Sequence, residues 1–154
     1  MNKTERWDRR YLELAKHVAT WSKDPSTQVG AVLVNYDKRK EFIGYNGFAQ
    51  GVGDDPERYA NRELKYKLVV HAEVNAIIKA GDYAIGSTLY VWPSFANPNI
   101  CHDCAKFAIQ AGIWYVVGYE ADENEERAAR WAESIGLAKQ MFTEAGVSWR
   151  VVKP

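Results

Sequence analysis

The sequence predicts an α/β fold, a three-layer αβα sandwich in which helices cover both faces of a five-stranded mixed sheet. Three observations support this. Apolar residues recur at helical spacing near the N-terminus, two short β-rich segments follow around a charged turn, and strands then alternate with helical segments as in parallel βαβ units. The chain of 154 residues has the length of one domain, so residues 1–154 are expected to form a single domain.

The first half of the chain supplies a helix and a hairpin. Residues 5–21 carry apolar side chains at helical spacing, and the Asp24-Pro25 pair ends the run. A buried strand is expected over residues 28–35 and a second strand over residues 42–45, with the charged turn between them. These two strands are predicted to pair.

The second half alternates helices with strands. Asp54-Asp55 followed by Pro56 signals a helix that runs to about Leu68. Val69-Val70 leads into His71, after which a mostly apolar helix ends at Gly81. The remaining expected elements are a strand at 88–92, a loop at 93–100, a helix at 101–111, a strand at 113–119, a helix at 123–145 with Gly136 as a candidate break, and a strand at 147–152. Only the later strands are expected to run parallel.

Charge and hydropathy favour a small-molecule substrate. Basic and acidic residues number 20 each, whereas proteins that follow nucleic-acid backbones usually carry a basic excess. Residues 1–10 are strongly polar, and no apolar run approaches the roughly 18 residues that a membrane span needs. We therefore expect neither a polynucleotide nor a membrane as a partner, and a cytoplasmic location.

His71, Glu73, Cys101 and Cys104 are the residues with the clearest chemistry. Side chains two apart in a helix interior point about 200° away from each other, so His71 and Glu73 can share a site only where a helix begins. Cys101 and Cys104 lie on one helix face, and two helix starts at one point favour thiolates. One imidazole and two thiolates are the three-ligand pattern of catalytic Zn²⁺, which leaves a position for water, with Glu73 as the base beside it.

Each of these residues also has a simpler explanation when it is taken alone. A Cys-x-x-Cys pair is typical of redox sites, a lone histidine is often structural, and an acid in a first turn is favoured by the helix dipole. A non-catalytic zinc or redox module is therefore the alternative from a different class. The joint placement of both motifs at helix starts, with strand signals before both, favours the zinc enzyme.

The His71-Ala72-Glu73 and Cys101-x-x-Cys104 motifs resemble the signature of the zinc deaminases. Residues 24–31, 44–47, 71–77, 104–106 and 110–113 resemble deoxycytidylate (dCMP) deaminases more narrowly, in an order that spans nearly the whole chain. The resemblance implies a cytidine-deaminase-like fold, Zn²⁺ as cofactor and Glu73 as the catalytic residue. It also implies hydrolysis of dCMP to dUMP and ammonia by a homo-oligomer, with a hexamer as the expected form.

Substrate contacts are expected from the same resemblance and from local chemistry. The candidates are Asn46 for the sugar hydroxyl, Lys23, Ser26 and Thr27 for the 5′-phosphate, and Ala72 and Tyr119 for the pocket lining. Each has a structural alternative: an Asn-Gly turn for Asn46, a solvated turn for the phosphate candidates, and plain packing for Tyr119 at the end of its strand.

Two departures from the family pattern bear on substrate choice and regulation. Ile100 stands where the family usually has proline before the first cysteine, and the loop at 93–100 is longer than usual. Ala49 replaces a frequent proline in a block linked to nucleotide regulation, so allosteric control is not implied. A deaminase of another substrate, such as guanine, cytidine or tRNA adenosine, is the alternative within the class.

Overall fold

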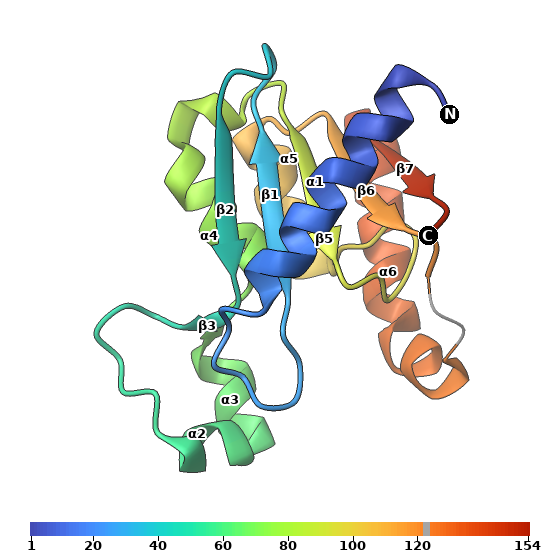
Figure 1. Ribbon diagram of the computed structural model, residues 1–154. Coiled ribbons are helices and arrows are strands. Elements are labelled where there is room, and N and C mark those ends of the chain that lie inside the picture. Colours follow the sequence, from blue (N-terminus) through green and yellow to red (C-terminus); the bar gives the residue numbers. More distant parts are fainter. Residues whose placement is uncertain (122–123) are drawn as a thin grey trace.

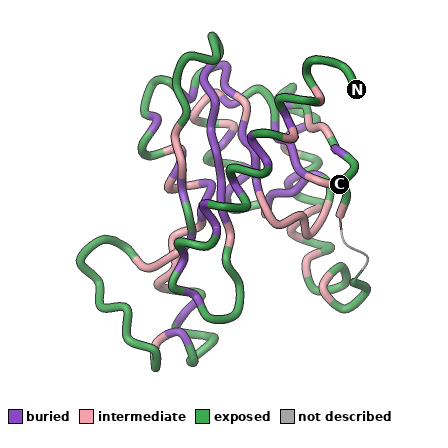
Figure 2. Tube along the Cα trace, viewed as in Figure 1, coloured by how far each residue is buried: buried purple, intermediate pink, exposed green. Residues whose placement is uncertain are grey.

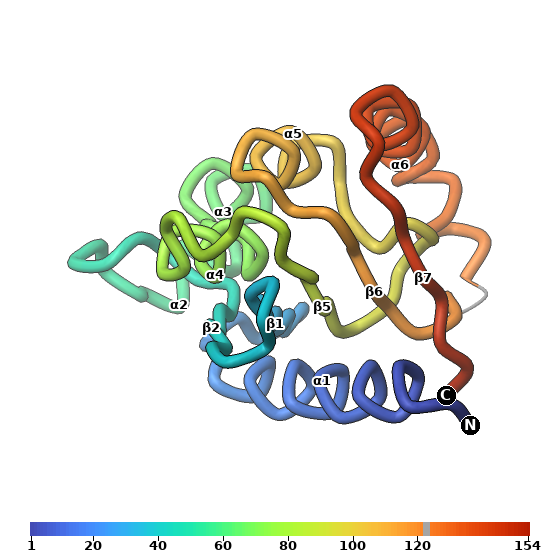
Figure 3. The backbone as a smooth tube through the Cα atoms, turned by 90° about the horizontal axis from the view of Figure 1, so that it is seen from above, coloured from blue at the N-terminus to red at the C-terminus, as the bar shows by residue number. Residues whose placement is uncertain are grey.

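The computed structural model describes residues 1–121 and 124–154 and has three layers. The middle layer is a five-stranded sheet of order β2-β1-β5-β6-β7. Helix α1 lies along one face of the sheet, and α4, α5 and α6 cover the other (Figure 3). The elements are α1 (Lys3–Ala19), β1 (Gly30–Val34), β2 (Glu41–Tyr45), β3 (Gly47–Phe48), α2 (Pro56–Ala60), α3 (Arg62–Leu68), β4 (Val69–Val70), α4 (Ala72–Ala80), a 3₁₀ turn (Gly81–Ala84), β5 (Thr88–Trp92), α5 (His102–Ala111), β6 (Tyr115–Tyr119), α6 (Glu125–Ala145) and β7 (Ser148–Val152).

The sheet is mixed, as the sequence predicts. Strand β1 pairs antiparallel with β2 and with β5, whereas β5, β6 and β7 run parallel (Figure 1). The predicted hairpin and the predicted parallel half are therefore both present. Each of the five expected strands lies within two residues of its predicted bounds. Across the described ranges, no helix is both long and apolar enough to cross a membrane.

An apolar cluster on each face of the sheet joins the layers. Under α1, Leu12 and Ala15 pack against Val32 of β1 and Val117 of β6. The opposite cluster is rich in alanine, whose short side chain lets α4 and α5 lie close to the strands. Strand β1 is buried along its whole length between these clusters (Figure 2).

Two helices differ from their predicted course. The expected helix from Pro56 to Leu68 is interrupted at Asn61, whose backbone is extended and whose side chain accepts a hydrogen bond from the Leu64 N–H to begin α3. Asparagine does this readily because its amide oxygen replaces the missing helical acceptor. Helix α6 continues through Gly136, and the predicted start at Glu123 lies outside the described residues. The short β3–β4 pair was not predicted.

Gly30 and Gly44 allow a helix to rest on each face of the β1–β2 hairpin. A Cβ atom at Gly30 would clash with the carbonyl oxygen of Ala15 in α1. A Cβ atom at Gly44 would clash with the Ala72 carbonyl oxygen and lie 2.6 Å from the Ala76 nitrogen, both in α4. Main-chain atoms cannot rotate out of the way as side chains can. The position of α4 therefore depends on the absence of a side chain at Gly44.

We expect Gly44→Ala to lower the free energy of unfolding by about 1–3 kcal/mol, as overpacking a core usually does. Gly136→Ala is the matched control, because an added Cβ there meets nothing within 4 Å. That change in α6 should raise the free energy of unfolding by about 0.5–1 kcal/mol. Urea denaturation measures both. A Gly44→Ala protein as stable as wild type would show that this close approach does not fix α4.

Candidate active site

His71 and Glu73 lie where α4 begins, as predicted, so the two side chains can share one site. His71 is the residue before the helix and has an extended backbone (φ −70°, ψ 151°), while Glu73 lies in the first turn. Strand β4 leads directly into His71 and is held by pairing with β3. Because His71 precedes the helix, its ring is free of the helical geometry that would direct it away from the Glu73 side chain.

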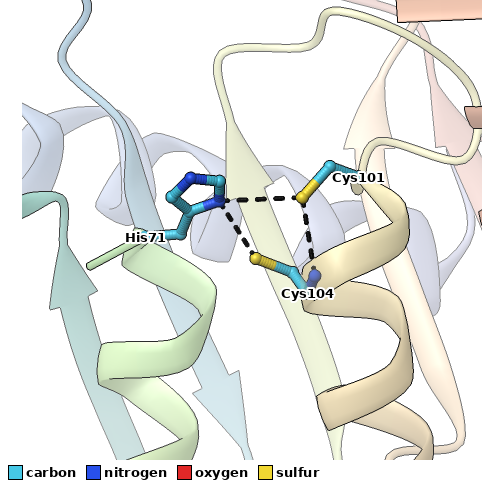
Figure 4. A group of neighbouring side chains, drawn as sticks. All are labelled: His71, Cys101 and Cys104. Atoms are coloured by element: carbon cyan, nitrogen blue, oxygen red, sulfur yellow. Dashed lines mark hydrogen bonds between the residues drawn. The ribbon is translucent and has the colours of Figure 1, made fainter. Parts of the chain in front are cut away.

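Cys101 and Cys104 lie where α5 begins, beside α4. Cys101 precedes the helix, and its sulfur accepts a hydrogen bond from the Cys104 N–H at 3.5 Å. The Nδ1 atom of His71 lies 3.2 Å from the Cys104 sulfur and 3.6 Å from the Cys101 sulfur (Figure 4). The three candidate ligand atoms all lie within 4.8 Å of one another. The structure therefore brings the three predicted metal ligands together.

This donor set fits Zn²⁺. An imidazole nitrogen and thiolate sulfurs are ligands that zinc prefers, and neither cysteine is part of a disulfide. Two thiolates formally balance the charge of the dication. Three protein ligands leave one tetrahedral position for a further ligand, which is typical of catalytic sites.

Cys101 is the more acidic of the two thiols. Hydrogen bonds to Cys104 and to His71 lower the pKa of Cys101 to about 4. The contact with the Cys101 sulfur also raises the pKa of His71 to about 9. The bond to Cys101 and burial together raise the pKa of Cys104. At pH 7 the metal-free site therefore holds a thiolate, an imidazolium and a neutral thiol.

Glu73 lies against this ligand set inside the protein. Its side chain is almost fully buried, with the residue 6% exposed, and burial raises the pKa of its carboxyl above the usual value. The nearby His71 and Cys104 side chains act against burial and lower the pKa of this carboxyl in part. A buried carboxyl with a raised pKa is suited to accept and return protons near neutral pH.

Comparison with known proteins identifies the family. Residues 5–120 match the family model described as the cytidine and deoxycytidylate deaminase zinc-binding region. The chain belongs to this family. Over 142 residues the deaminase is 40% identical to an uncharacterized deaminase in the luxG 3′ region of Aliivibrio fischeri, covering 92% of this chain and 90% of that one. It is 36% identical to the deoxycytidylate deaminase of Mus musculus over 156 residues, covering 96% and 80% of the two chains.

Solved structures show the same fold. The dCMP deaminase of the cyanophage S-TIM5 superposes on the deaminase with a TM-score of 0.68 at 22% identity, and the match covers 99% of this chain and 100% of that one. The expected cytidine-deaminase-like sandwich is therefore confirmed. Because the matched family region is a zinc-binding one and contains His71, Cys101 and Cys104, zinc is the metal of this site.

Asp24 organises the loop that holds the phosphate candidates. Its buried carboxylate forms a 2.7 Å ion pair with Lys65 of α3 and accepts hydrogen bonds from the Ser26 and Thr27 N–H groups at 2.9 and 3.1 Å. The Ser26 hydroxyl donates to Asp24 at 3.0 Å and accepts from Lys65 at 2.8 Å. Burial acts to raise the pKa of Asp24, but these bonds outweigh it and lower the pKa. Sequence reasoning missed Lys65 because it is far from Asp24 along the chain.

Asn46 and Lys23 have other partners in this structure. Asn46 is buried behind the loop, where its Oδ1 accepts from the Val29 N–H at 2.8 Å and its Nδ2 donates to the Thr27 carbonyl at 2.9 Å. It therefore ties the loop rather than forming a hairpin turn. Lys23 is exposed and bonds Asp54 at 2.9 Å. Their contacts with substrate stay predictions.

Tyr119 and Ala72 are not among the residues that line the pocket of Ser26 and Thr27. Tyr119 donates a 2.7 Å hydrogen bond to Glu13 of α1 and lines a pocket of about 480 Å³ on the α1 side, where burial raises the pKa of Tyr119 to about 12. Ser26 and Thr27 line a neighbouring pocket that shares Trp92 and Pro93 with the first. Ala72 is fully buried in the core. Contact of Tyr119 or Ala72 with substrate therefore stays a prediction.

Metal binding should release protons. Since His71 and Cys104 are protonated at pH 7 and both must lose a proton to bind a metal, adding Zn²⁺ to metal-free protein should release about two protons per site. The number should fall toward one as the pH rises through about 9, the pKa of His71. Calorimetry in buffers of different ionisation enthalpy measures this release. Release of no protons at pH 7 would contradict the assigned protonation states.

Cys104→Ser should lose the metal and much of the stability, because a hydroxyl is a poor zinc ligand and the buried site is left uncompensated. His102→Ala is the matched control. His102 lies between the two cysteines in sequence, yet it is exposed and its ring lies 2.8 Å from the Ser134 hydroxyl of α6. Metal content by mass spectrometry should stay at one zinc per chain in His102→Ala. A folded, zinc-loaded Cys104→Ser protein would remove Cys104 from the ligand set.

Proposed function

We propose that this protein hydrolyses dCMP to dUMP and ammonia. The observation that carries the proposal is the buried Glu73 carboxyl against the His71, Cys101 and Cys104 set, at the meeting point of two helix starts. The relative from Mus musculus is named deoxycytidylate deaminase and matches most of both chains, which supports dCMP as the substrate. The zero net charge also favours a mononucleotide over a polynucleotide.

The mechanism assigns one task to each group. His71, Cys101 and Cys104 would hold Zn²⁺, which when bound makes a water acidic enough to react at neutral pH. Glu73 accepts a proton from the attacking water as its oxygen bonds to C4 of the ring, and gives that proton to N3. Glu73 then transfers the second proton of that oxygen to the amino group, the C4–N bond breaks, and ammonia leaves. Burial keeps the Glu73 proton from exchanging freely with bulk water.

The proposal also covers assembly and location. We expect a cytoplasmic homo-oligomer, with a hexamer as the form that the resemblance implies. Ile78 of α4 and Phe107 of α5 are large apolar side chains exposed in the single chain, and contact with another copy would bury them. Light scattering gives the mass of the assembly directly.

A substrate panel with an acid–base variant tests the function. Wild type should release ammonia from dCMP faster than from cytosine, cytidine, guanine or adenosine. Glu73→Gln should keep its zinc and lose roughly 10²-fold to 10⁴-fold in kcat, because general acid–base help is typically of that size. Glu63→Gln is the control, because Glu63 is an exposed acid on α3 paired with Lys67, and it should leave zinc content and kcat unchanged. Activity of Glu73→Gln within about tenfold of wild type would exclude this role.

A further inference from the structure

A pocket opens between the Asp24 loop and the loop that leads to the zinc ligands. Its volume is about 390 Å³, within the range of small-molecule sites. Trp92 at the end of β5 and Pro93 line one side, and the loop that follows them leads to Cys101. The lining residues are Asp24, Pro25, Ser26, Thr27, Gln28, Trp92, Pro93, Phe95 and Arg127.

Arg127 gives this pocket a positive charge. Its guanidinium carbon lies 4.7 Å above the centre of the Phe95 ring, a cation–π contact that holds the group in place. The acidic residue among those that line the pocket, Asp24, is already paired with Lys65. Arg127 belongs to the first turn of α6, and this helix lies on the same side of the sheet as α4 and α5 (Figure 3).

The loop at 93–100 supplies the Phe95 ring that contacts Arg127. Buried Asn99 fixes that loop, since its Nδ2 donates to the Val91 and Pro93 carbonyls at 3.1 and 2.9 Å. Its Oδ1 accepts from the Phe95 N–H at 3.0 Å. The position of Phe95 is therefore set by the loop itself.

We propose that Arg127, held on Phe95, binds the 5′-phosphate of the substrate and makes the enzyme prefer a nucleotide to a nucleoside. This inference rests on the proposed dCMP deamination. Arginine offers paired N–H donors that match two phosphate oxygens, and such charge-assisted bonds are strong. Arg127 is thus a specificity-determining residue supplied by α6.

The other phosphate candidates are less free to act. Lys23 bonds Asp54 and is not among the residues that line the pocket. The Ser26 hydroxyl is held between Asp24 and Lys65. Thr27 lines the pocket together with Arg127, and because its bond to Asp24 is made by the main-chain N–H, its hydroxyl can act as a neutral donor.

The test compares Arg127→Gln, Arg127→Lys and a control on the same helix, Arg130→Gln, which is exposed. Arg127→Gln should lower kcat/KM for dCMP by about tenfold to a hundredfold, mainly through KM, as expected for one lost charge-assisted bond pair. Deamination of deoxycytidine should stay nearly unchanged. Arg127→Lys should recover part of the loss, and Arg130→Gln should match wild type. Calorimetry should show the same loss for dUMP binding and none for deoxyuridine.

Three results would overturn the inference. An equal loss for dCMP and deoxycytidine would mean that Arg127 supports the fold only. An unchanged dCMP preference in Arg127→Gln would mean that another group binds the phosphate, and Lys23→Ala would then be the variant that loses it. Equal binding of dUMP to Arg127→Gln and wild type would exclude the contact. If wild type does not deaminate dCMP at all, the proposed function fails, while the dUMP binding comparison still decides the role of Arg127.

Discussion

Two helix N-termini directed at one point are the constraint on which this structure depends. Each start of α4 and α5 carries partial positive charge, so bringing them together is unfavourable unless anionic groups lie between them. The ionised Cys101 sulfur does so directly, since it accepts the Cys104 N–H. The positive potential of the helix N-termini in turn lowers the pKa of the thiol and so stabilises the thiolate. The ligand chemistry and the packing of the two helices therefore reinforce each other.

The rest of the scaffold fixes where the two helices begin. Gly44 lets α4 rest on β2, and the alanine-rich cluster lets α4 and α5 approach the strands closely. Strand β5 and the loop tied by Asn99 then bring the chain to Cys101. The substrate-side pocket lies against the same loop and against the loop tied by Asp24. Metal site and pocket thus share one end of the sheet.

Local patterns were enough to predict the sheet and the metal ligands. Short apolar segments between turn residues predict the five strands, and His71, Cys101 and Cys104 stand out because each motif lies at a helix start. The interruption at Asn61 was missed, since asparagine is tolerated inside a helix and only its capping bond shows otherwise. Lys65 and Arg127 were missed for another reason. Their partners Asp24 and Phe95 are distant in sequence, and only the fold brings them together.

The low pKa of Cys101 has a consequence for the lifetime of the enzyme. A half-buried thiolate is the form of cysteine that oxidants attack first, and Cys104 stands close enough to condense with an oxidised neighbour as a disulfide. Bound zinc occupies both sulfurs and shields them from that chemistry. The metal that enables catalysis therefore also protects its own ligands from oxidation. A molecule that loses its zinc under oxidising conditions can form the disulfide and then can no longer bind zinc through these two sulfurs.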